Sequence, residues 1–340
     1  AVLITGREQL EAREVPEPEA RAGAAVVAIE RCGICGTDVA AWRSGDPYPP
    51  FLCGHEWVGR IAALGRGVEG LREGDRAVMG VPVACGICGE CRAGHGHRCA
   101  AIMALAYGLQ PLTPPHGGYA PRIAVPADHL VVAPEDLPVD AAAQVEPATV
   151  ALHAVRRRPP RLGDRVLVLG AGPIGLYAAQ LARIAGAGEV YLLEPKAERR
   201  ALATGLGTTL ALAPGPEAME AIRARTPGRL GVDLVYECSG SQSALDAGFE
   251  LVRPGGAFML IGVNHAGVRL DPLACITKEI VLDNSTAHHH HEFRITMDLM
   301  RDGRLVTGPI HSRTIDLDGL ADAFASLAAG HEAKVLVASG

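Results

Sequence analysis

The alternation of apolar and polar positions divides the chain into two regions of different texture. Residues 1–150 are rich in glycine, proline and short β-branched runs, such as 25–30 and 58–64, which predict small strands with tight turns. From about residue 160, longer apolar runs alternate with helical segments. Each of these runs is predicted to form a strand, and they lie at 165–169, 189–194, 209–213, 232–237, 257–263 and 280–283. Strands that alternate with helices indicate a doubly wound parallel sheet, so the expected fold class is α/β.

The tail from about residue 286 returns to helices and short strands and ends in an apolar run at 334–338. Because this tail resembles the first region, we expect the parallel-sheet domain to be inserted into the other one. The expected boundaries are 1–155 and 286–340 for the β-rich domain and 156–285 for the inserted domain. The pair Pro159 and Pro160 marks the boundary near residue 160.

A glycine-rich loop follows the predicted strand 165–169 and opens the next helix. In such a G-x-G-x-x-G loop the first glycine permits a tight turn, the second lets a pyrophosphate approach the backbone, and the third lets the helix pack on the strand. The N-terminus of the helix then stabilises the phosphates. We therefore expect a dinucleotide to contact Gly170, Gly172, Pro173, Ile174 and Gly175.

A carboxylate at the end of the second strand, Glu194, favours NAD over NADP. It is placed to accept hydrogen bonds from the ribose 2′-hydroxyl and it repels a 2′-phosphate. The pair Arg199 and Arg200 leaves NADP as the alternative, because an arginine here can approach a phosphate. Arg199 stays a candidate cofactor contact, although a solvated helix face is the interpretation that we favour for both arginines.

Four cysteines follow the spacing C-x2-C-x2-C-x7-C, at Cys85, Cys88, Cys91 and Cys99. Two-residue spacings let a tight loop aim three thiolates inward, and the longer return brings the fourth, as tetrahedral zinc requires at about 2.3 Å. A closed site of four cysteines has no open position, so it predicts structural zinc. This clustering, in a long chain without a basic-then-apolar leader, favours metal binding in a reducing cytoplasm over disulfides.

A second and incomplete set of ligands precedes these cysteines. Cys35 lies in a Gly-Ile-Cys-Gly-Thr-Asp segment and His55 in a Gly-His-Glu segment. Two ligands cannot close a zinc site alone. A set that borrows a third ligand leaves one position for water or substrate, as catalytic zinc requires.

Composition and charge exclude several kinds of partner. The net charge of -6 and the pI of about 6.1 give no general attraction to nucleic acid or to anionic membranes. No apolar run approaches the roughly 18 residues of a membrane helix.

The cysteines outside the two metal-ligand patterns are expected to be small buried residues, and they are Cys32, Cys53, Cys238 and Cys275.

With both metal-ligand patterns and the dinucleotide loop in this order, the chain resembles the medium-chain zinc-dependent alcohol dehydrogenases over its full length. It looks closest to their polyol branch of sorbitol and butanediol dehydrogenases. The resemblance implies a GroES-like catalytic domain with an inserted Rossmann domain, two zinc ions per chain, and homodimers or homotetramers. It also implies an oxidoreductase that transfers a hydride between a secondary alcohol, diol, cyclitol or polyol and NAD.

Three alternatives remain beside this activity. The chain is either a dehydrogenase or a ketone or aldehyde reductase that works mainly toward the alcohol, because sequence does not fix direction. A non-catalytic dinucleotide-binding relative is disfavoured by the presence of the catalytic ligands, and a redox or zinc-storage protein leaves the dinucleotide domain unexplained.

The resemblance also implies the ligands of the catalytic zinc. Glu146 stands where the better-known alcohol dehydrogenases have a third zinc cysteine. Cys35, His55 and Glu146 therefore surround the catalytic metal, and Glu56 is a second carboxylate that exchanges onto zinc or tunes it. The alternative for Glu146 is a carboxylate that stabilises the start of a helix.

Further roles follow from the same family pattern. Thr37 is placed to relay the substrate proton, and Lys334 aligns with a basic residue that approaches the pyrophosphate, with an ordinary surface lysine as the alternative. Many relatives carry an outer-relay histidine where this chain has Ala40, so no outer base is assigned. The Arg-Tyr pair of the sorbitol enzymes corresponds to Ala287 and His288 here, which favours a smaller diol, cyclitol or secondary alcohol.

The internal histidine run 288–291 is expected to be a solvated loop, with His288 as a candidate pocket residue. Trp57 and Tyr107 are candidate pocket walls, although a core position is more common for each residue type. His153 is expected to be a packed helix residue rather than a ligand.

Overall fold

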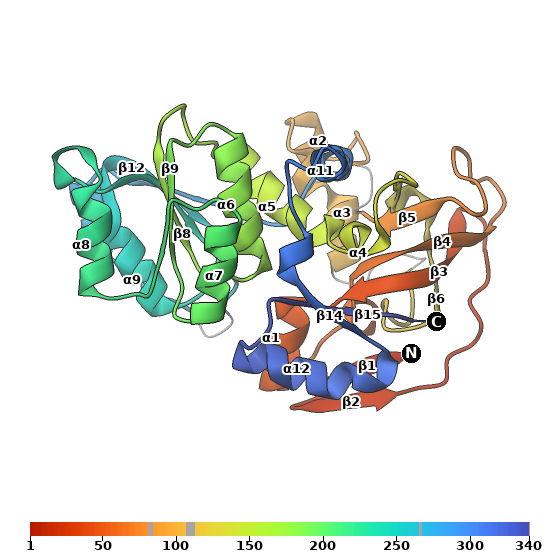
Figure 1. The fold of residues 1–340 in the computed structure, drawn as a ribbon. Coiled ribbons are helices and arrows are strands. Elements are labelled where there is room, and N and C mark those ends of the chain that lie inside the picture. The colour runs from red at the N-terminus through yellow and green to blue at the C-terminus, as the bar shows by residue number, and fades with distance from the viewer. Residues whose placement is uncertain (81–83, 107–112, 265–266, 340) are drawn as a thin grey trace. The chain divides into compact units, whose positions relative to one another are not determined.

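The computed structural model describes residues 1–80, 84–106, 113–264 and 267–339, and the chain divides into two compact units (Figure 1). The first unit consists of Ala1–Thr149, His288–Gly303 and His311–Gly340. The second consists of Val150–Ala287 and Arg304–Ile310.

A seven-stranded sheet forms the centre of the first unit, in the order β14-β15-β3-β4-β5-β7 with β6 paired to β3. A separate hairpin joins β1 and β2. The strands are β1 (Val2–Gly6), β2 (Gln9–Ala12), β3 (Ala24–Gly33), β4 (Glu56–Leu64), β5 (Arg76–Met79), β6 (Arg122–Pro126), β7 (Leu130–Val132), β14 (His311–Ile315) and β15 (Lys334–Val337). The long antiparallel pairing of β3 with β4 brings the C-terminal end of β3 beside the N-terminal end of β4, and this end of the sheet positions the candidate site.

Helices and short 3-10 turns connect these strands. The helices of the first unit are α1 (Gly36–Ser44), α2 (Gly89–Arg92), α3 (Ala100–Ala106), α4 (Val139–Ala142), α11 (His290–Arg301) and α12 (Leu320–Ala329), and α5 (Val145–Arg157) begins there. The 3-10 turns are η1 (Pro50–Leu52), η2 (Gly96–Arg98), η3 (Ala127–His129) and η6 (Leu317–Gly319).

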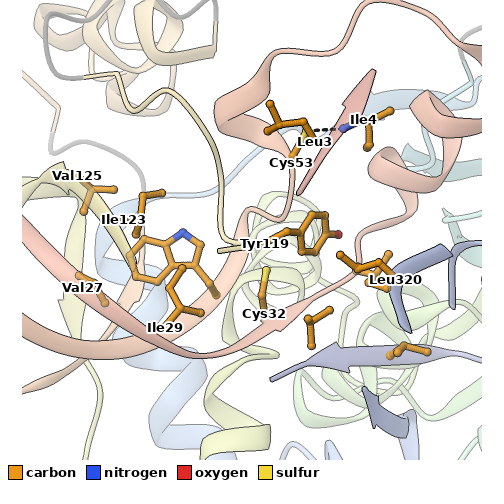
Figure 2. Close-up of a cluster of buried hydrophobic side chains, with 14 of the residues drawn as sticks. Leu3, Ile4, Val27, Ile29, Cys32, Cys53, Tyr119, Ile123, Val125 and Leu320 are labelled. Atoms are coloured by element: carbon orange, nitrogen blue, oxygen red, sulfur yellow. Dashed lines mark hydrogen bonds between the residues drawn. The ribbon is translucent and has the colours of Figure 1, made fainter. Parts of the chain in front are cut away.

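The core of the first unit packs side chains from β3, β4, β6 and α12 around Tyr119 (Figure 2). Cys32 and Cys53 are fully buried within it, as expected for small apolar side chains. The thiol of Cys53 accepts a hydrogen bond from the backbone N–H of Ile4 at 3.5 Å. Trp57 also lies in this core, at 2% exposure.

The second unit is a parallel sheet in the order β10-β9-β8-β11-β12-β13, flanked by helices. The strands are β8 (Arg165–Leu169), β9 (Glu189–Leu193), β10 (Leu210–Leu212), β11 (Val232–Glu237), β12 (Val252–Leu260) and β13 (Val281–Asn284). The helices and turns are α6 (Pro173–Ile184), α7 (Ala197–Gly205), α8 (Pro216–Ala224), α9 (Gln242–Leu251), α10 (Pro272–Thr277), η4 (Pro227–Arg229) and η5 (Gly308–Ile310). This is the strand order of a dinucleotide-binding sheet, and the predicted α/β fold class is confirmed.

The compact units differ from the expected domain boundaries in three places, because residues 150–155, 286–287 and 304–310 belong to the second unit. The division after Thr149 falls inside the continuous helix α5, so no linker marks it. The segment Arg304–Ile310 joins the second unit because Gln180 of α6 bonds both backbone groups of Val306, at 2.8 Å and 3.1 Å.

No helix in the described part of the chain is long and apolar enough to cross a membrane.

Candidate functional site

The glycine loop lies between β8 and α6, as the sequence predicts. Gly172 is the residue before the first turn of α6, Pro173 begins the helix and Ile174 follows. A Cβ atom added at Gly175 would lie 2.0 Å from the carbonyl oxygen of Gly170, so the helix packs this closely only with glycine there. A Cβ at Gly172 would meet nothing within 4 Å, so the backbone is open at the position where a pyrophosphate approaches.

Glu194 closes one side of this loop. It follows β9, and its carboxylate accepts hydrogen bonds from the N–H of Ala171 at 2.8 Å and of Lys196 at 2.9 Å. Arg200 donates to the carbonyl oxygens of Glu194 and Pro195 at 2.8 and 2.7 Å. Arg200 is therefore tied to the backbone and half-buried, and it is not on the solvated helix face that the sequence favoured.

Arg199 occupies the first turn of α7 and is also half-buried, so it is less exposed than the solvated helix face expected for it.

The structure brings Cys35, His55 and Glu56 together, and we call these three residues the Cys35 cluster. One ligand atom from each lies within 4.8 Å of the others. The register of β3 with β4 places Gly33 opposite Glu56, so Cys35, at the start of α1, meets the beginning of β4. A Cβ at Gly33 would lie 2.3 Å from a carboxylate oxygen of Glu56, so this approach needs glycine.

The hydrogen bonds of His55 leave one ring nitrogen for a metal. Its Nδ1 lies 2.9 Å from the carbonyl oxygen of Leu52, which can only accept, so Nδ1 carries a proton and Nε2 is the nitrogen left to bind a metal. A backbone oxygen on the outer nitrogen is the usual support of a metal-binding histidine. A thiolate, an imidazole nitrogen and a carboxylate are the donors that zinc binds, so the residues present fit a zinc ion.

Glu56 is paired with Lys334, which begins β15. The Lys334 ammonium donates to the Glu56 carboxylate at 2.5 Å and to the carbonyl oxygen of Ile34 at 2.9 Å, and both charged side chains are at most 2% exposed. Burial raises the pKa of Glu56, and the charge of Lys334 counteracts this only in part. Burial disfavours the charged form of Lys334, but the charge of Glu56 outweighs it and raises the pKa of the lysine.

This arrangement corrects the expected role of Lys334. The lysine is not a surface residue, because its ammonium is buried against a carboxylate and a carbonyl oxygen. Its approach to the pyrophosphate stays a prediction. Its position balances the second carboxylate of the Cys35 cluster.

Glu146 lies in the first turn of α5 and is not among the three mutually close ligand groups. His288 lies 3.1 Å from it through Nε2, with exposures of 5% for the histidine and 18% for the glutamate. Burial raises the pKa of Glu146, but the hydrogen bond and charge of His288 outweigh it, so the pKa is lowered. Charge coupling of Glu146 to His55 and Lys334 places it in the same neighbourhood.

The expected solvated loop at 288–291 is wrong. His288 is 4% exposed and packs edge-on against Phe293, with ring centroids 4.6 Å apart. His289 precedes the first turn of α11 and His290 begins that helix. The run therefore starts a helix, and only its last member, His291, is exposed.

Asp38 is a fully buried carboxylate beside the Cys35 cluster. It accepts hydrogen bonds from the hydroxyl groups of Tyr48 at 2.8 Å and of Tyr119 at 2.7 Å, and from the N–H of Cys35 at 3.3 Å. Sequence reasoning missed both tyrosines. No local signal identifies them, because Tyr119 is 81 residues from its partner.

Thr37 lies in α1, and its hydroxyl donates to the Cys35 thiol at 3.2 Å. The expected proton relay is thus in contact with the Cys35 cluster. Ala40 follows on the same helix and carries no polar group.

The four remaining predicted ligands form the Cys85 cluster, which consists of Cys85, Cys88, Cys91 and Cys99. Their sulfur atoms lie within 4.8 Å of one another, and all nine cysteines of the chain are free thiols. The N–H of Cys85 donates to the Cys99 sulfur at 3.3 Å. Backbone hydrogen bonds from Ala100 and Cys91 lower the pKa of Cys88 to about 6. Four converging sulfurs with one thiolate already favoured fit a closed zinc site.

The other sequence candidates lie away from these clusters or outside the described residues. Tyr107 is among the residues that the structure does not describe. His153 is 3% exposed within α5, in agreement with a packed helix residue. Cys238 and Cys275 are half-buried, less than expected for core cysteines.

Comparison with known families identifies both halves of the chain. The family described as "Alcohol dehydrogenase GroES-like domain" matches residues 21–135, and "Zinc-binding dehydrogenase" matches residues 173–302.

Individual relatives cover nearly the whole chain. An L-threonine 3-dehydrogenase of Streptomyces avermitilis is 31% identical over 95% of this chain and 94% of its own length. A probable D-xylulose reductase A of Aspergillus clavatus is 28% identical over 99% of this chain and 95% of its own length. A putative zinc-binding dehydrogenase from Sinorhizobium meliloti, solved bound to NADP, aligns with a TM-score of 0.85 and 31% identity, over 99% of this chain and 98% of that one.

Proposed function

Because the chain belongs to the family of medium-chain zinc-dependent alcohol dehydrogenases, we propose that it is an NAD-dependent oxidoreductase acting on a secondary alcohol, diol, cyclitol or polyol. The first unit serves as the GroES-like catalytic domain, and the second as the Rossmann domain. The observation that carries the proposal is the convergence of Cys35, His55 and Glu56 at one end of the seven-stranded sheet, with Glu146 nearby.

Catalytic zinc is held by Cys35 and His55 together with a carboxylate from Glu56 or Glu146. When bound, it supplies a Lewis acid that lowers the pKa of the substrate hydroxyl. The protein contributes the orientation of the ligands. Leu52 fixes the ring of His55, Lys334 fixes Glu56, and His288 fixes Glu146.

Thr37 is placed to relay the proton of the substrate hydroxyl, because its own hydroxyl lies beside the Cys35 sulfur, and it would pass on its own proton as it accepts that of the substrate. The absence of a histidine at Ala40 leaves the next step of the relay to other groups.

The dinucleotide is NAD, bound at Gly170, Gly172, Pro173, Ile174 and Gly175. Bound NAD supplies the hydride acceptor. The carboxylate of Glu194 supports NAD over NADP, since it lies beside the loop and repels a second phosphate. The relative from Sinorhizobium meliloti binds NADP, so the choice requires direct measurement of both cofactors, and Arg199 is the residue to test if NADP is used.

The Cys85 cluster holds the second, structural zinc. Four thiolate ligands leave no coordination position of the zinc open for a substrate. The cluster therefore stabilises the segment 84–106 rather than taking part in catalysis.

The substrate is a smaller molecule than sorbitol. Ala287 supplies no donor, and His288 is engaged with Glu146, so the five donors of an arginine are missing at this place. Reduction toward the alcohol is the second candidate, favoured by the relative named as a xylulose reductase.

The chain assembles with copies of itself into a homodimer or homotetramer. The strand β13 is an edge of the parallel sheet, and Val281 and Leu282 on it are 45% and 39% exposed. The adjacent α10 exposes Leu273 and Ile276. An apolar open edge of this kind is suited to pairing with a second copy across a two-fold axis.

Nine free cysteines support a reducing compartment, the cytoplasm, as the location of the protein.

The test is NAD reduction by the purified protein across diols, polyols, cyclitols and secondary alcohols. Each substrate is run as purified, after treatment with a chelator, and after restoration of zinc, and NADP is compared with NAD. Turnover on one class that the chelator abolishes and zinc restores supports the proposal. Turnover that is unchanged in fully zinc-free protein contradicts it.

A further inference from the structure

Tyr48 lies between α1 and η1, in a segment to which the sequence pattern assigns no function. Its hydroxyl oxygen is 3.4 Å from the Thr37 hydroxyl and 2.8 Å from a carboxylate oxygen of Asp38. The phenol is half-buried. Tyr48 therefore links the expected proton relay to a buried carboxylate.

The inventory of donors fixes the direction of these bonds. A carboxylate accepts hydrogen bonds and donates none, so the single proton of Tyr48 points to Asp38. At the contact with Thr37, the Tyr48 oxygen can then only accept. Burial and the negative charge of Asp38 raise the pKa of Tyr48, which keeps the phenol protonated.

Asp38 is itself held rigidly, so it fixes Tyr48. Its second oxygen accepts from Tyr119 and from the N–H of Cys35, and its side chain is fully buried. The carboxylate cannot rotate without losing several hydrogen bonds in a site that excludes water.

Thr37 has one proton and two neighbours that can accept it, the sulfur of Cys35 and the oxygen of Tyr48. As long as the proton points at either neighbour, a lone pair of the Thr37 oxygen is free to accept from a substrate hydroxyl. Without Tyr48 only the Cys35 sulfur, a weak acceptor, remains to hold the Thr37 proton, so the hydroxyl is held less firmly and turns toward the substrate more often.

We propose that Tyr48 is a positioning residue for Thr37, which keeps the Thr37 hydroxyl oriented as an acceptor for the substrate hydroxyl. The inference rests on the proposed function for the identity of the substrate hydroxyl. The hydroxyl-to-hydroxyl bond does not depend on that function.

The chain offers a matched control in Tyr119. Both tyrosines donate to Asp38 at nearly equal distances, but Tyr119 is 1% exposed, contacts Phe324 with its ring and has no bond to Thr37 (Figure 2 shows Tyr119 in the core). Tyr119→Phe therefore removes a bond to Asp38 without removing the acceptor for Thr37.

The first experiment compares the steady-state kinetics of Tyr48→Phe and Tyr119→Phe as zinc-loaded full-length proteins. We expect Tyr48→Phe to lower kcat by about 10- to 100-fold with KM changed less than about threefold, since an orientation needed only in the transition state is lost. Tyr119→Phe leaves the hydroxyl pair of Tyr48 and Thr37 in place, so it is expected to lower the unfolding temperature and to lower kcat at least about fivefold less than Tyr48→Phe does. Equal losses of kcat in both variants, or no loss in Tyr48→Phe, would overturn the inference.

The second experiment needs no turnover. The urea midpoints of Tyr48→Phe, Thr37→Val and the double variant are compared with the wild type in a double-mutant cycle. If the two hydroxyls are bonded, the double variant shifts the midpoint by less than the sum of the single shifts. Additive shifts overturn the inference. Lack of wild-type turnover on every alcohol would count against the proposed function, while this cycle would still decide whether Tyr48 holds Thr37.

Discussion

The Cys35 cluster and the Cys85 cluster are both groups of potential zinc ligands, but the protein supports them in opposite ways. The first is assembled from the ends of β3, β4 and α1, in a sheet whose core is apolar and closed. Glu56 is buried against Lys334, and the half-buried His55 is hydrogen-bonded to the backbone. The second lies on short helices within residues 85–99, with Cys85 exposed and Cys88 and Cys91 half-exposed.

The difference indicates which interactions stabilise the structure around each cluster. Around Cys35, sheet pairing and a buried ion pair hold the ligands in position before any metal binds, so the site is preorganised. Around Cys85 little apolar surface is buried, so binding of zinc supplies the energy that orders the segment. Loss of metal should therefore disable the first cluster chemically and the second structurally.

Cys35→Ser tests the chemical side of the comparison and has the largest expected effect. Replacing the thiolate should lower kcat/KM by about 1000-fold or more, because it removes a proposed ligand of the metal that acts on the substrate. The unfolding temperature should stay within a few degrees of the wild type, since the thiol is not part of the core. An unfolding temperature that falls as far as in the Cys88 variant described below would remove the distinction between the clusters.

Lys334→Met tests how strongly the Cys35 cluster depends on its buried ion pair. The variant leaves Glu56 buried without its cation, which is expected to cost about 3–5 kcal/mol of unfolding free energy. The double variant Glu56→Leu/Lys334→Met should regain most of this loss, because no buried charge remains. Chemical denaturation of the three proteins measures both changes, and a double variant no more stable than the single one would contradict this explanation.

Cys88→Ser tests the structural side. We expect one zinc equivalent to be lost, the segment 84–106 to become sensitive to protease, and the unfolding temperature to fall by about 5 °C. The kcat of the folded fraction should stay within about threefold of the wild type. A loss of turnover as large as that of Cys35→Ser would show that this cluster takes part in the chemistry.

The sequence predicted the two clusters unequally. The Cys85 cluster depends on spacing within fifteen residues, which local chain geometry fixes. Its members could therefore be predicted from the sequence alone, without knowledge of the fold. Cys35 and His55 were found as an incomplete set, but their supports were not. Lys334 is 278 residues from Glu56, and the bond between them follows from the pairing of β15 with β3, which no local pattern encodes.

The strands were predicted to within a few residues where the apolar run was continuous, as in β8 and β11. β12 begins at Val252, five residues before the predicted run, because the strand continues through Pro254 and Gly255, residue types that are common in turns. The histidine run at 288–291 was expected to be a solvated loop. Pairing of His288 with Glu146, 142 residues away, buries it instead.

His288→Ala tests whether the support of Glu146 matters for the metal. The variant should bind catalytic zinc about tenfold less tightly in competition with a chelator, since the hydrogen-bond partner of Glu146, a proposed ligand, is lost. His291→Ala, at an exposed position on the same run, is the control and should bind zinc as the wild type does. Equal affinities in the two variants would contradict a supporting role for His288.

The two clusters should also differ in how their affinity for zinc depends on pH, and this difference is expected to be smaller than the effects above. The pKa of Cys88 is lowered to about 6 by backbone N–H groups, so above pH 6 its thiolate is already present. Below pH 6 zinc must displace one further proton, and the affinity of the Cys85 cluster should fall by about an additional factor of ten per pH unit. Zinc titrations of Cys35→Ser between pH 5 and 7 measure this, and an unchanged slope across pH 6 would argue against the preformed thiolate.

The most direct test of the central claim is a stepwise zinc titration of protein stripped by a chelator, with NAD reduction and unfolding temperature followed on the same samples. If the two clusters are separate sites with separate roles, one equivalent restores the unfolding temperature and the other restores turnover. The Cys88→Ser variant should then recover its turnover with a single equivalent of zinc, the one that binds at the Cys35 cluster. Recovery of turnover and stability together with a single equivalent, in both proteins, would contradict the account.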